Sequence, residues 1–139
     1  MSSQFLTKSK DRIRDHGEVF TPDFIVNDML DLVYQETQRI ESRFLEPACG
    51  DGNFLASILS RKIAVVDKIY KKNQFDYEKN ALLALSSVYG IDLLGDNVSD
   101  AQQRLYDIVS THYIRLYKKK INNDFLKSCE YLLSKNIIQ

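Results

Sequence analysis

The stretch FLEPACGDGNFL, residues 44–55, decides the fold of this chain. Its first residues form a short apolar run that ends at Pro47, which predicts a β-strand stopping at a turn. Gly50 and Gly52 then allow a tight turn, and Asn53 begins a helix. Apolar residues recur at helical spacing in this helix and give it one inner face, formed by Phe54, Leu55, Ile58 and Leu59.

Upstream, residues 1–20 are polar and mixed in charge, and we expect a short helix followed by a loop there. A helix should then start around Pro22, because proline is tolerated in the first helical turn and Thr21 or Asp23 can cap the free amides. We expect this helix to run to about Thr37. Its apolar face would consist of Ile25, Met29, Leu32 and Val33.

Downstream, helical and extended patterns alternate. Residues 68–77 are polar and lysine-rich, which predicts a loop, and residues 78–87 have a helical pattern. Residues 88–92 predict a second strand and residues 98–117 a long amphipathic helix. A further helix holds Phe125, Cys129, Leu132 and Leu133, and the last four residues, 136–139, resemble the opening of a third strand.

This order predicts an α/β fold with a parallel sheet and right-handed crossovers. Three strands make only half of a doubly wound sheet. We therefore expect a partial, Rossmann-like sheet, in which a strand that is central in the complete fold lacks a neighbour on one side. Residues 1–20 would form an N-terminal helical segment and residues 21–139 one incomplete domain.

Composition limits the classes of function. The chain has 139 residues, of which 44% are hydrophobic, as is ordinary for one globular domain. Nineteen basic and nineteen acidic residues give a net charge of zero, so any nucleic-acid contact has to come from a local patch. Lysines cluster at 68–72 and 118–120, but we interpret them as solvated faces or as charges that match helix C-termini. The start of the chain lacks a signal peptide and no apolar run approaches membrane-spanning length, which favours a cytoplasmic protein without membrane contact.

Several common sites are disfavoured. A dinucleotide fingerprint needs a third glycine where Leu55 stands, and the chain has no Gly-Lys-Ser/Thr sequence for a phosphate loop. Cys49 and Cys129 have no second ligand at zinc spacing and give no disulfide framework. We expect Cys49 to be a small buried residue of the turn and Cys129 to belong to the core.

Three segments together resemble the S-adenosylmethionine-dependent DNA adenine-N6 methyltransferases of restriction-modification systems. Residues 46–55 are similar to the cofactor loop of that family. The sequence GEVFTP at residues 17–22 resembles the segment that these enzymes place against the methionine part of the cofactor, and its position before the loop indicates the γ order of motifs. The sequence YGID at residues 89–92 resembles the second strand, whose terminal acid binds the ribose hydroxyls.

The resemblance implies S-adenosyl-L-methionine as the cofactor. Glu46 would pair with its ammonium group, Asp92 would accept hydrogen bonds from both ribose hydroxyls, and Thr21 would offer a hydroxyl near the methionine end. Structural roles remain as alternatives: Glu46 as a solvated acid, Asp92 as the cap of the next segment, and Thr21 as a helix cap. The predicted cofactor-binding set is Thr21, Glu46, Pro47, Cys49, Gly50, Gly52, Asn53, Phe54 and Asp92, with no catalytic residue and no metal ligand.

The acceptor loop of the resembled family, with its Pro-Pro pair, has no counterpart here, because the only prolines are Pro22 and Pro47. A cytosine-C5 enzyme needs a Pro-Cys nucleophile, and Ala48 separates Pro47 from Cys49. We therefore expect residues 21–139 to be the incomplete, cofactor-binding part of a DNA methyltransferase catalytic domain, inactive alone.

The partners implied for the complete enzyme are DNA and either a restriction or specificity subunit or the missing C-terminal half. Self-association through an exposed sheet edge is a further expectation. Two alternatives stay open. One is an S-adenosylmethionine-binding or partner-pairing module without activity, and the other is a fragment of a protein or RNA methyltransferase with the same chemistry.

Overall fold

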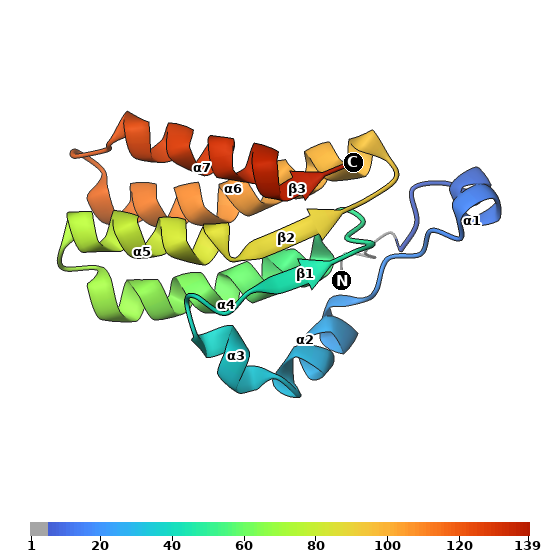
Figure 1. Ribbon diagram of the computed structural model, residues 1–139, viewed down its shortest axis with the longest axis horizontal. Helices are drawn as coiled ribbons and strands as arrows, with labels where there is room; N and C mark the ends of the chain where they lie inside the picture. Colours follow the sequence, from blue (N-terminus) through green and yellow to red (C-terminus); the bar gives the residue numbers. More distant parts are fainter. Residues whose placement is uncertain (1–5) are drawn as a thin grey trace.

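The computed structural model describes residues 6–139, which form seven helices and a three-stranded parallel sheet (Figure 1). The strands β1 (Phe44–Glu46), β2 (Val88–Ile91) and β3 (Ile137–Ile138) lie in the order β1-β2-β3. Phe44 pairs with Val88, and Gly90 pairs with Ile137. The predicted α/β class, the parallel sheet and the third strand are therefore confirmed. Residues 1–5 of the expected N-terminal segment lie outside the described residues.

Each connection between strands contains two helices, because parallel strands need a long crossover. The first consists of α4 (Asn53–Tyr70) and α5 (Gln74–Ser86), and the second of α6 (Gly95–Tyr117) and α7 (Asn123–Asn136). Figure 1 shows α5 and α7 running nearly in line with the strands that follow them, while α4 and α6 lie behind. The two helices of the first crossover fill the long stretch of sequence between the glycine turn at Gly52 and β2, which begins at Val88.

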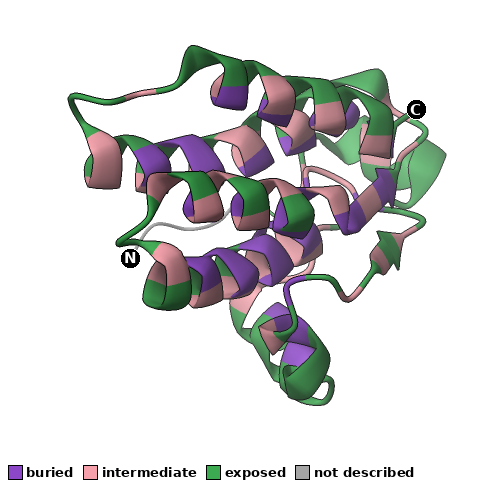
Figure 2. Ribbon diagram, turned by 60° about the vertical axis from the view of Figure 1, so that its left-hand side comes forward, coloured by how far each residue is buried: buried purple, intermediate pink, exposed green. Residues whose placement is uncertain are grey.

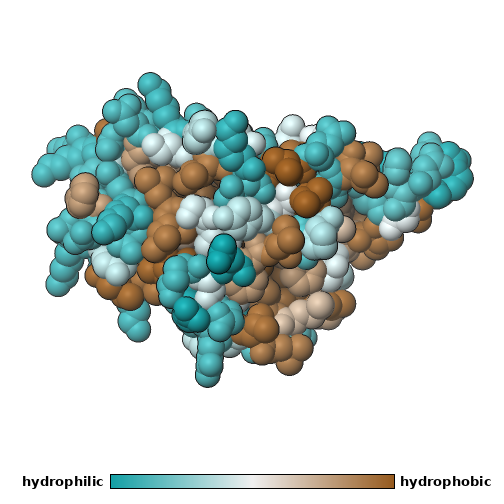
Figure 3. All heavy atoms as spheres, in the orientation of Figure 1, coloured by the Kyte–Doolittle hydropathy of each residue, from teal (hydrophilic) through white to brown (hydrophobic). Residues whose placement is uncertain are grey.

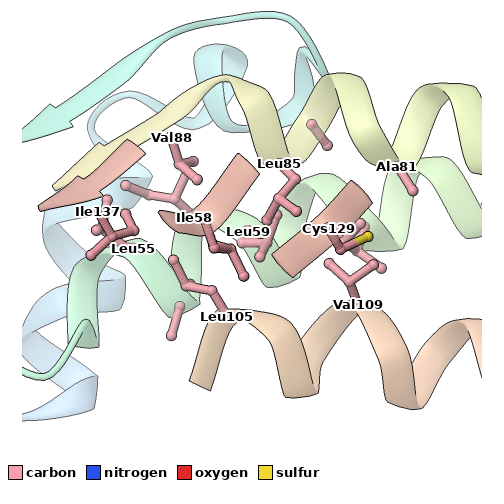
Figure 4. Packing of buried hydrophobic residues seen from close by; sticks show 14 of the residues in the cluster. Leu55, Ile58, Leu59, Ala81, Leu85, Val88, Leu105, Val109, Cys129 and Ile137 are labelled. Atoms are coloured by element: carbon pink, nitrogen blue, oxygen red, sulfur yellow. The ribbon is translucent and has the colours of Figure 1, made fainter. Parts of the chain in front are cut away.

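The core lies between these four helices and one face of the sheet. In Figure 2 the buried residues follow the facing sides of the helices, and Figure 4 shows side chains from α4, α5, α6 and α7 meeting behind β2 and β3. Leucines 55, 59 and 105 are fully enclosed. At the far end of the helices, the rings of Tyr77, Tyr113, Tyr117 and Phe125 pack against one another.

The opposite face of the sheet carries apolar side chains that no described helix covers. Leu45, Ile91 and Ile138 are 64%, 40% and 45% exposed. The strand register places Leu45 beside Tyr89 and Ile91 beside Ile138, so these residues form one surface. Parallel sheets are normally covered on both faces. Figure 3, which looks onto this side, shows hydrophobic residues over the strands and over the helices below them.

The helix expected from Pro22 to Thr37 differs in the structure. It is divided into α2 (Asp23–Asp31) and α3 (Tyr34–Gln38), and the N-cap of α2 is Pro22, with no side-chain cap. The predicted apolar face was wrong: Ile25, Met29, Leu32 and Val33 are all exposed, while Val26 and Leu30 are buried. Only one narrow stripe of α2 is buried, because this helix packs mainly against a single neighbour, α4.

The lysine-rich stretch 68–77 was wrongly predicted to be a loop. The helix α4 continues to Tyr70, and α5 begins at Gln74 after the cap Asn73, whose side chain accepts the Asp76 N–H. Lysines on the solvent-facing side of a helix make its local composition polar, so the apolar stripe on the buried side is easily missed in the sequence. The helix α6 also starts earlier than expected. The short α1 (Lys10–His16), which ends at Gly17, agrees with the prediction. Among residues 6–139, no helix combines the length and apolar character that crossing a membrane requires.

Candidate cofactor-binding site

A cleft of about 380 Å³ opens at the carboxyl ends of β1 and β2. Three segments line it: residues 16–21, the β1–α4 loop with the start of α4, and residues 92–94. Ligands of open α/β sheets bind outside the carboxyl ends of the strands. All residues of the predicted set except Gly52 line this one cleft. The three segments that carry the resemblance are far apart in the sequence and meet here.

The β1–α4 loop is held against β2 by hydrogen bonds. The Cys49 N–H donates to the Ile91 carbonyl at 2.9 Å, and the Gly50 N–H donates to Asp92 Oδ2 at 3.0 Å. Within the loop, the Gly52 N–H donates to the Cys49 carbonyl at 3.0 Å, which closes the turn. The bend therefore keeps a fixed position next to the second strand and leaves the cleft open.

Asp92 has a structural role within this cleft. Its Oδ1 accepts the Leu94 N–H at 2.9 Å and the Asn97 amide at 3.2 Å, in addition to the Gly50 bond on the other oxygen. Asp92 therefore braces the segment that follows β2, although the N-cap of α6 is Leu94 and has no side-chain cap. The carboxylate also lines the cleft. A carboxylate accepts about four hydrogen bonds, so these three leave Asp92 about one more for a ligand.

Glu46 ends β1 on the same side. Its Oε1 accepts the Ala48 N–H at 3.3 Å, and the side chain is only partly buried. Neither Glu46 nor Asp92 forms an ion pair with a cation among residues 6–139. Two carboxylates at the tips of adjacent strands thus converge on one cleft with their charges uncompensated.

Four carboxylates line the cleft, together with His16 and mostly apolar residues. Glu18 and Asp51 add two carboxylates, and among residues 6–139 no lysine or arginine lines the cleft. Glu18 is compensated by Arg12, whose Nε lies 2.8 Å from Oε1. Burial raises the pKa of Asp51, against the opposing effect of nearby Arg104. A site of this charge repels phosphate groups and favours a cationic or hydroxyl-rich ligand.

Residues 16–21 form the outer wall of the cleft, and ion pairs attach the segment directly before this wall to α6. Arg12 Nη1 lies 2.5 Å from Asp96, and Lys8 lies 3.0 Å from the same carboxylate. Both cations lower the pKa of Asp96, chiefly through hydrogen bonds to its carboxylate. Asn97 of α6, which is buried, donates to Glu18 at 2.6 Å. The wall therefore depends on contacts that are about eighty residues apart in the sequence.

Thr21, Phe20 and Asn53 join this wall to the glycine turn. The Asn53 amide donates to the Thr21 carbonyl at 2.9 Å, and its Oδ1 accepts from Arg104 at 2.5 Å. A Cβ on Gly50 would lie 3.0 Å from the Phe20 ring, so the ring covers the bend closely. Thr21 does not cap α2, since the N-cap is Pro22, and the interpretation of Thr21 as a cap was wrong.

Gly52 was predicted to bind the cofactor, but it is not among the residues that line the cleft. It is the N-cap of α4 with φ 92°, and a Cβ there would lie 3.2 Å from the Ala101 Cβ of α6. A left-handed backbone and a close helix approach both require glycine. The residue therefore shapes the turn and the packing of α4 on α6 and does not approach a ligand.

Pro47, Cys49 and Phe54 line the cleft as expected. Burial, together with the negative charge of Asp92, raises the pKa of the Cys49 thiol to about 11. Burial and the raised pKa both disfavour the thiolate, which is the nucleophilic form of cysteine. Cys129 is fully buried in the core, as predicted. Among the described residues, no three His, Cys, Asp or Glu side chains are placed to hold a metal ion.

Some residues of the site were missed by the sequence interpretation. Arg12, Asn97 and Arg104 hold the lining residues Glu18 and Asn53 in position. Nothing in their local sequence marks them, because their partners lie elsewhere in the chain. Phe20 and Glu18 lie within the GEVFTP segment, which was the signal that could have identified them. No family model, curated protein or solved structure matches the chain.

Proposed function

We propose that the cleft binds S-adenosylmethionine and that the chain is the cofactor-binding part of a DNA adenine-N6 methyltransferase. One observation carries the proposal: Glu46 and Asp92 converge beside the glycine turn in a cleft that no described lysine or arginine lines. The same charge argues against nucleoside di- and triphosphates and against dinucleotides, whose phosphates need positive partners.

The chemistry of the lining fits this cofactor. A carboxylate such as Glu46 pairs with an ammonium group, and Asp92 can accept about one further hydrogen bond, from a ribose hydroxyl. At the bend, the ring of Phe20 lies over Gly50 and adds an apolar surface to the cleft. A volume of about 380 Å³ lies within the range of about 300–1,000 Å³ of small-molecule sites.

When bound, this cofactor supplies a methyl group activated by the positively charged sulfur. The residues of this chain would bind and orient it: the acids at the two strand tips fix opposite ends, and the GEVFTP segment lies against the methionine part. No residue of the described cleft is proposed to hold or deprotonate the acceptor amine. We expect the isolated chain to transfer no labelled methyl group to DNA.

The proposal includes the partial doubly wound sheet and its partners. Leu45, Ile91 and Ile138 leave an apolar sheet face uncovered, and among the described strands β1 pairs only with β2. A further polypeptide layer, whether a C-terminal half or a separate restriction or specificity subunit, would cover that face in an enzyme that acts on DNA in the cytoplasm. The uncovered face also favours a second candidate function, a partner-pairing module that binds the cofactor without activity.

Isothermal calorimetry tests the proposal with S-adenosylmethionine and ATP as ligands. Both contain adenosine, but only ATP carries phosphates. Glu46→Gln removes the negative charge while keeping an oxygen for the Ala48 N–H. Glu41→Gln is the matched control, because Glu41 is exposed outside the cleft and pairs with Arg39.

We expect S-adenosylmethionine to bind, Glu46→Gln to weaken it about tenfold or more, and Glu41→Gln to leave it unchanged, since a charged hydrogen bond contributes about 1.5–3 kcal/mol. ATP should give no heat. Absence of heat with S-adenosylmethionine, or equal affinity for ATP, would contradict the proposal.

A further inference from the structure

We propose that the end of the molecule opposite the cleft binds the backbone of single-stranded nucleic acid. This surface, called the lysine end below, is formed by Lys68, Lys71, Lys72, Lys118, Lys119 and Lys120, with Phe75 among them. It does not depend on the proposed cofactor site.

The fold brings together two lysine runs that are almost fifty residues apart. The first lies at the end of α4 and in the loop after it, and the second lies in the loop after α6. The Tyr117 hydroxyl donates to the Lys71 carbonyl at 2.9 Å, and the Gln74 amide donates to the Lys120 carbonyl at 2.6 Å. Figure 1 shows both loops at the same end of the helices, away from the carboxyl ends of the strands. The structure therefore creates one basic surface where the sequence shows two separate runs.

The positive charge of the lysine end is not compensated locally. All six lysines are exposed, and within residues 6–139 none of them forms an ion pair. Two half-buried acids lie close by, but both have other partners: Asp67 accepts from Tyr77 and pairs with His112 and Arg115, and Glu78 accepts from Tyr113. Asp76 and Asp124 occupy the first turns of α5 and α7, where helix N-termini stabilise them.

Helix dipoles explain only part of this arrangement. Lys68 and Lys118 stand at the C-terminal ends of α4 and α6, where cations are favoured. Lys72, Lys119 and Lys120 lie beyond those helix ends. The chain has zero net charge, but its six lysines without ion pairs lie at one end and the acidic cleft lies at the other. Of these two ends, only the lysine end is complementary to a polyanion.

The exposed ring of Phe75 favours single-stranded over double-stranded nucleic acid as the ligand. It is 73% exposed in the first turn of α5, directly after Gln74, which contacts the second loop. Phe75 follows Lys72 by three residues, and its exposed ring offers a stacking surface for a base whose phosphates the lysines would contact. The helix α6, with 23 residues, spans about 34 Å between this end and the cleft, so the two sites are separate.

Fluorescence anisotropy with a labelled 20-nucleotide oligothymidylate measures the binding. Six phosphate contacts predict a slope of log K against log salt of about −4, which corresponds to an affinity about 250-fold weaker at 200 mM than at 50 mM salt. Charge reversal by Lys71→Glu, Lys72→Glu and Lys119→Glu should bring the slope to about −2 or abolish binding. Phe75→Ala should weaken binding about tenfold.

The control variant combines Lys10→Glu, Lys127→Glu and Lys135→Glu, which change the net charge by the same amount at exposed positions outside the lysine end. This variant should retain most of the affinity and the slope of about −4. Equal loss in both triple variants, or no binding at 50 mM salt, would overturn the proposal. Binding to phosphatidylserine vesicles without binding to the oligonucleotide would also overturn it and assign the surface to membranes instead.

Discussion

Replacement of Gly52 by alanine tests how the glycine turn and the helix packing depend on each other. Gly52 has φ 92°, which costs a residue with a Cβ about 1–2 kcal/mol. The new methyl group would also lie 3.2 Å from the Ala101 Cβ and 3.3 Å from its Cα, and relief of such overpacking costs about 1–3 kcal/mol. We therefore expect Gly52→Ala to lower the free energy of unfolding by about 2–5 kcal/mol, a large part of a typical stability of about 5–15 kcal/mol.

Gly17→Ala provides the matched control. Gly17 also has a left-handed backbone, with φ 63°, but a Cβ there meets no atom within 4 Å. It should cost only the backbone contribution of about 1–2 kcal/mol. Urea unfolding followed by far-ultraviolet circular dichroism gives both values, and their difference measures the close approach of α4 to α6.

Ligand binding by Gly52→Ala decides the role of the residue. The folded variant should bind S-adenosylmethionine as the unaltered chain does, because Gly52 does not line the cleft. Equal destabilisation by the two glycine variants would refute the packing argument. Lost affinity in a variant of unchanged stability would restore the direct ligand contact that the sequence predicted.

Three other variants and one chemical probe test further features. Burial lowers the pKa of Lys62 to about 8, so between this value and about pH 10.5 the unfolded chain holds a proton that the folded chain has released. The free energy of unfolding should therefore rise over this pH range, by up to about 3 kcal/mol. Urea titrations should show that Lys62→Met removes this rise. With a pKa of about 11, the Cys49 thiol should react with iodoacetamide at pH 8 about a hundredfold more slowly than a free cysteine, as mass spectrometry can follow; rapid native labelling would contradict its burial. Arg12→Ala should reduce the free energy of unfolding by about 1 kcal/mol or less. It should also weaken the affinity for S-adenosylmethionine measured by calorimetry, because it releases Glu18 and the outer wall of the cleft. Unchanged affinity would show that the wall does not contribute to binding. Leu45→Glu should reduce any concentration-dependent association seen by sedimentation, because it places a charge on the uncovered sheet face, and association that persists would assign it to another surface.

Local patterns were sufficient for the elements that build the cleft. The strand Phe44–Glu46, the glycine turn and the helix from Asn53 follow from an apolar run, a proline, two glycines and a helical repeat, all within a dozen residues. The strand ending before Asp92 is similarly local. The position of both acids at the same edge then follows from the parallel order of the strands.

Local patterns failed where neighbours along the chain do not determine the outcome. The periodicity of Ile25, Met29, Leu32 and Val33 indicated a buried face, but α2 meets α4 through Val26 and Leu30. At residues 68–77, lysines on the outer side concealed the continuing helix. A helical repeat shows that a helix forms, whereas the stripe that becomes buried depends on the helix packed against it.

The order of strands and helices, the acidic tips of two strands and the glycine turn between them are properties of short segments, which backbone sterics and side-chain periodicity decide in the sequence alone. The assignment of Gly52 to helix packing, the attachment of Glu18 through Arg12 and the joining of two lysine runs at one end depend on contacts between residues distant in the sequence. Only the packing of α4 against α6, and of their loops against each other, sets those distances, because no spacing along a chain specifies which distant surfaces meet.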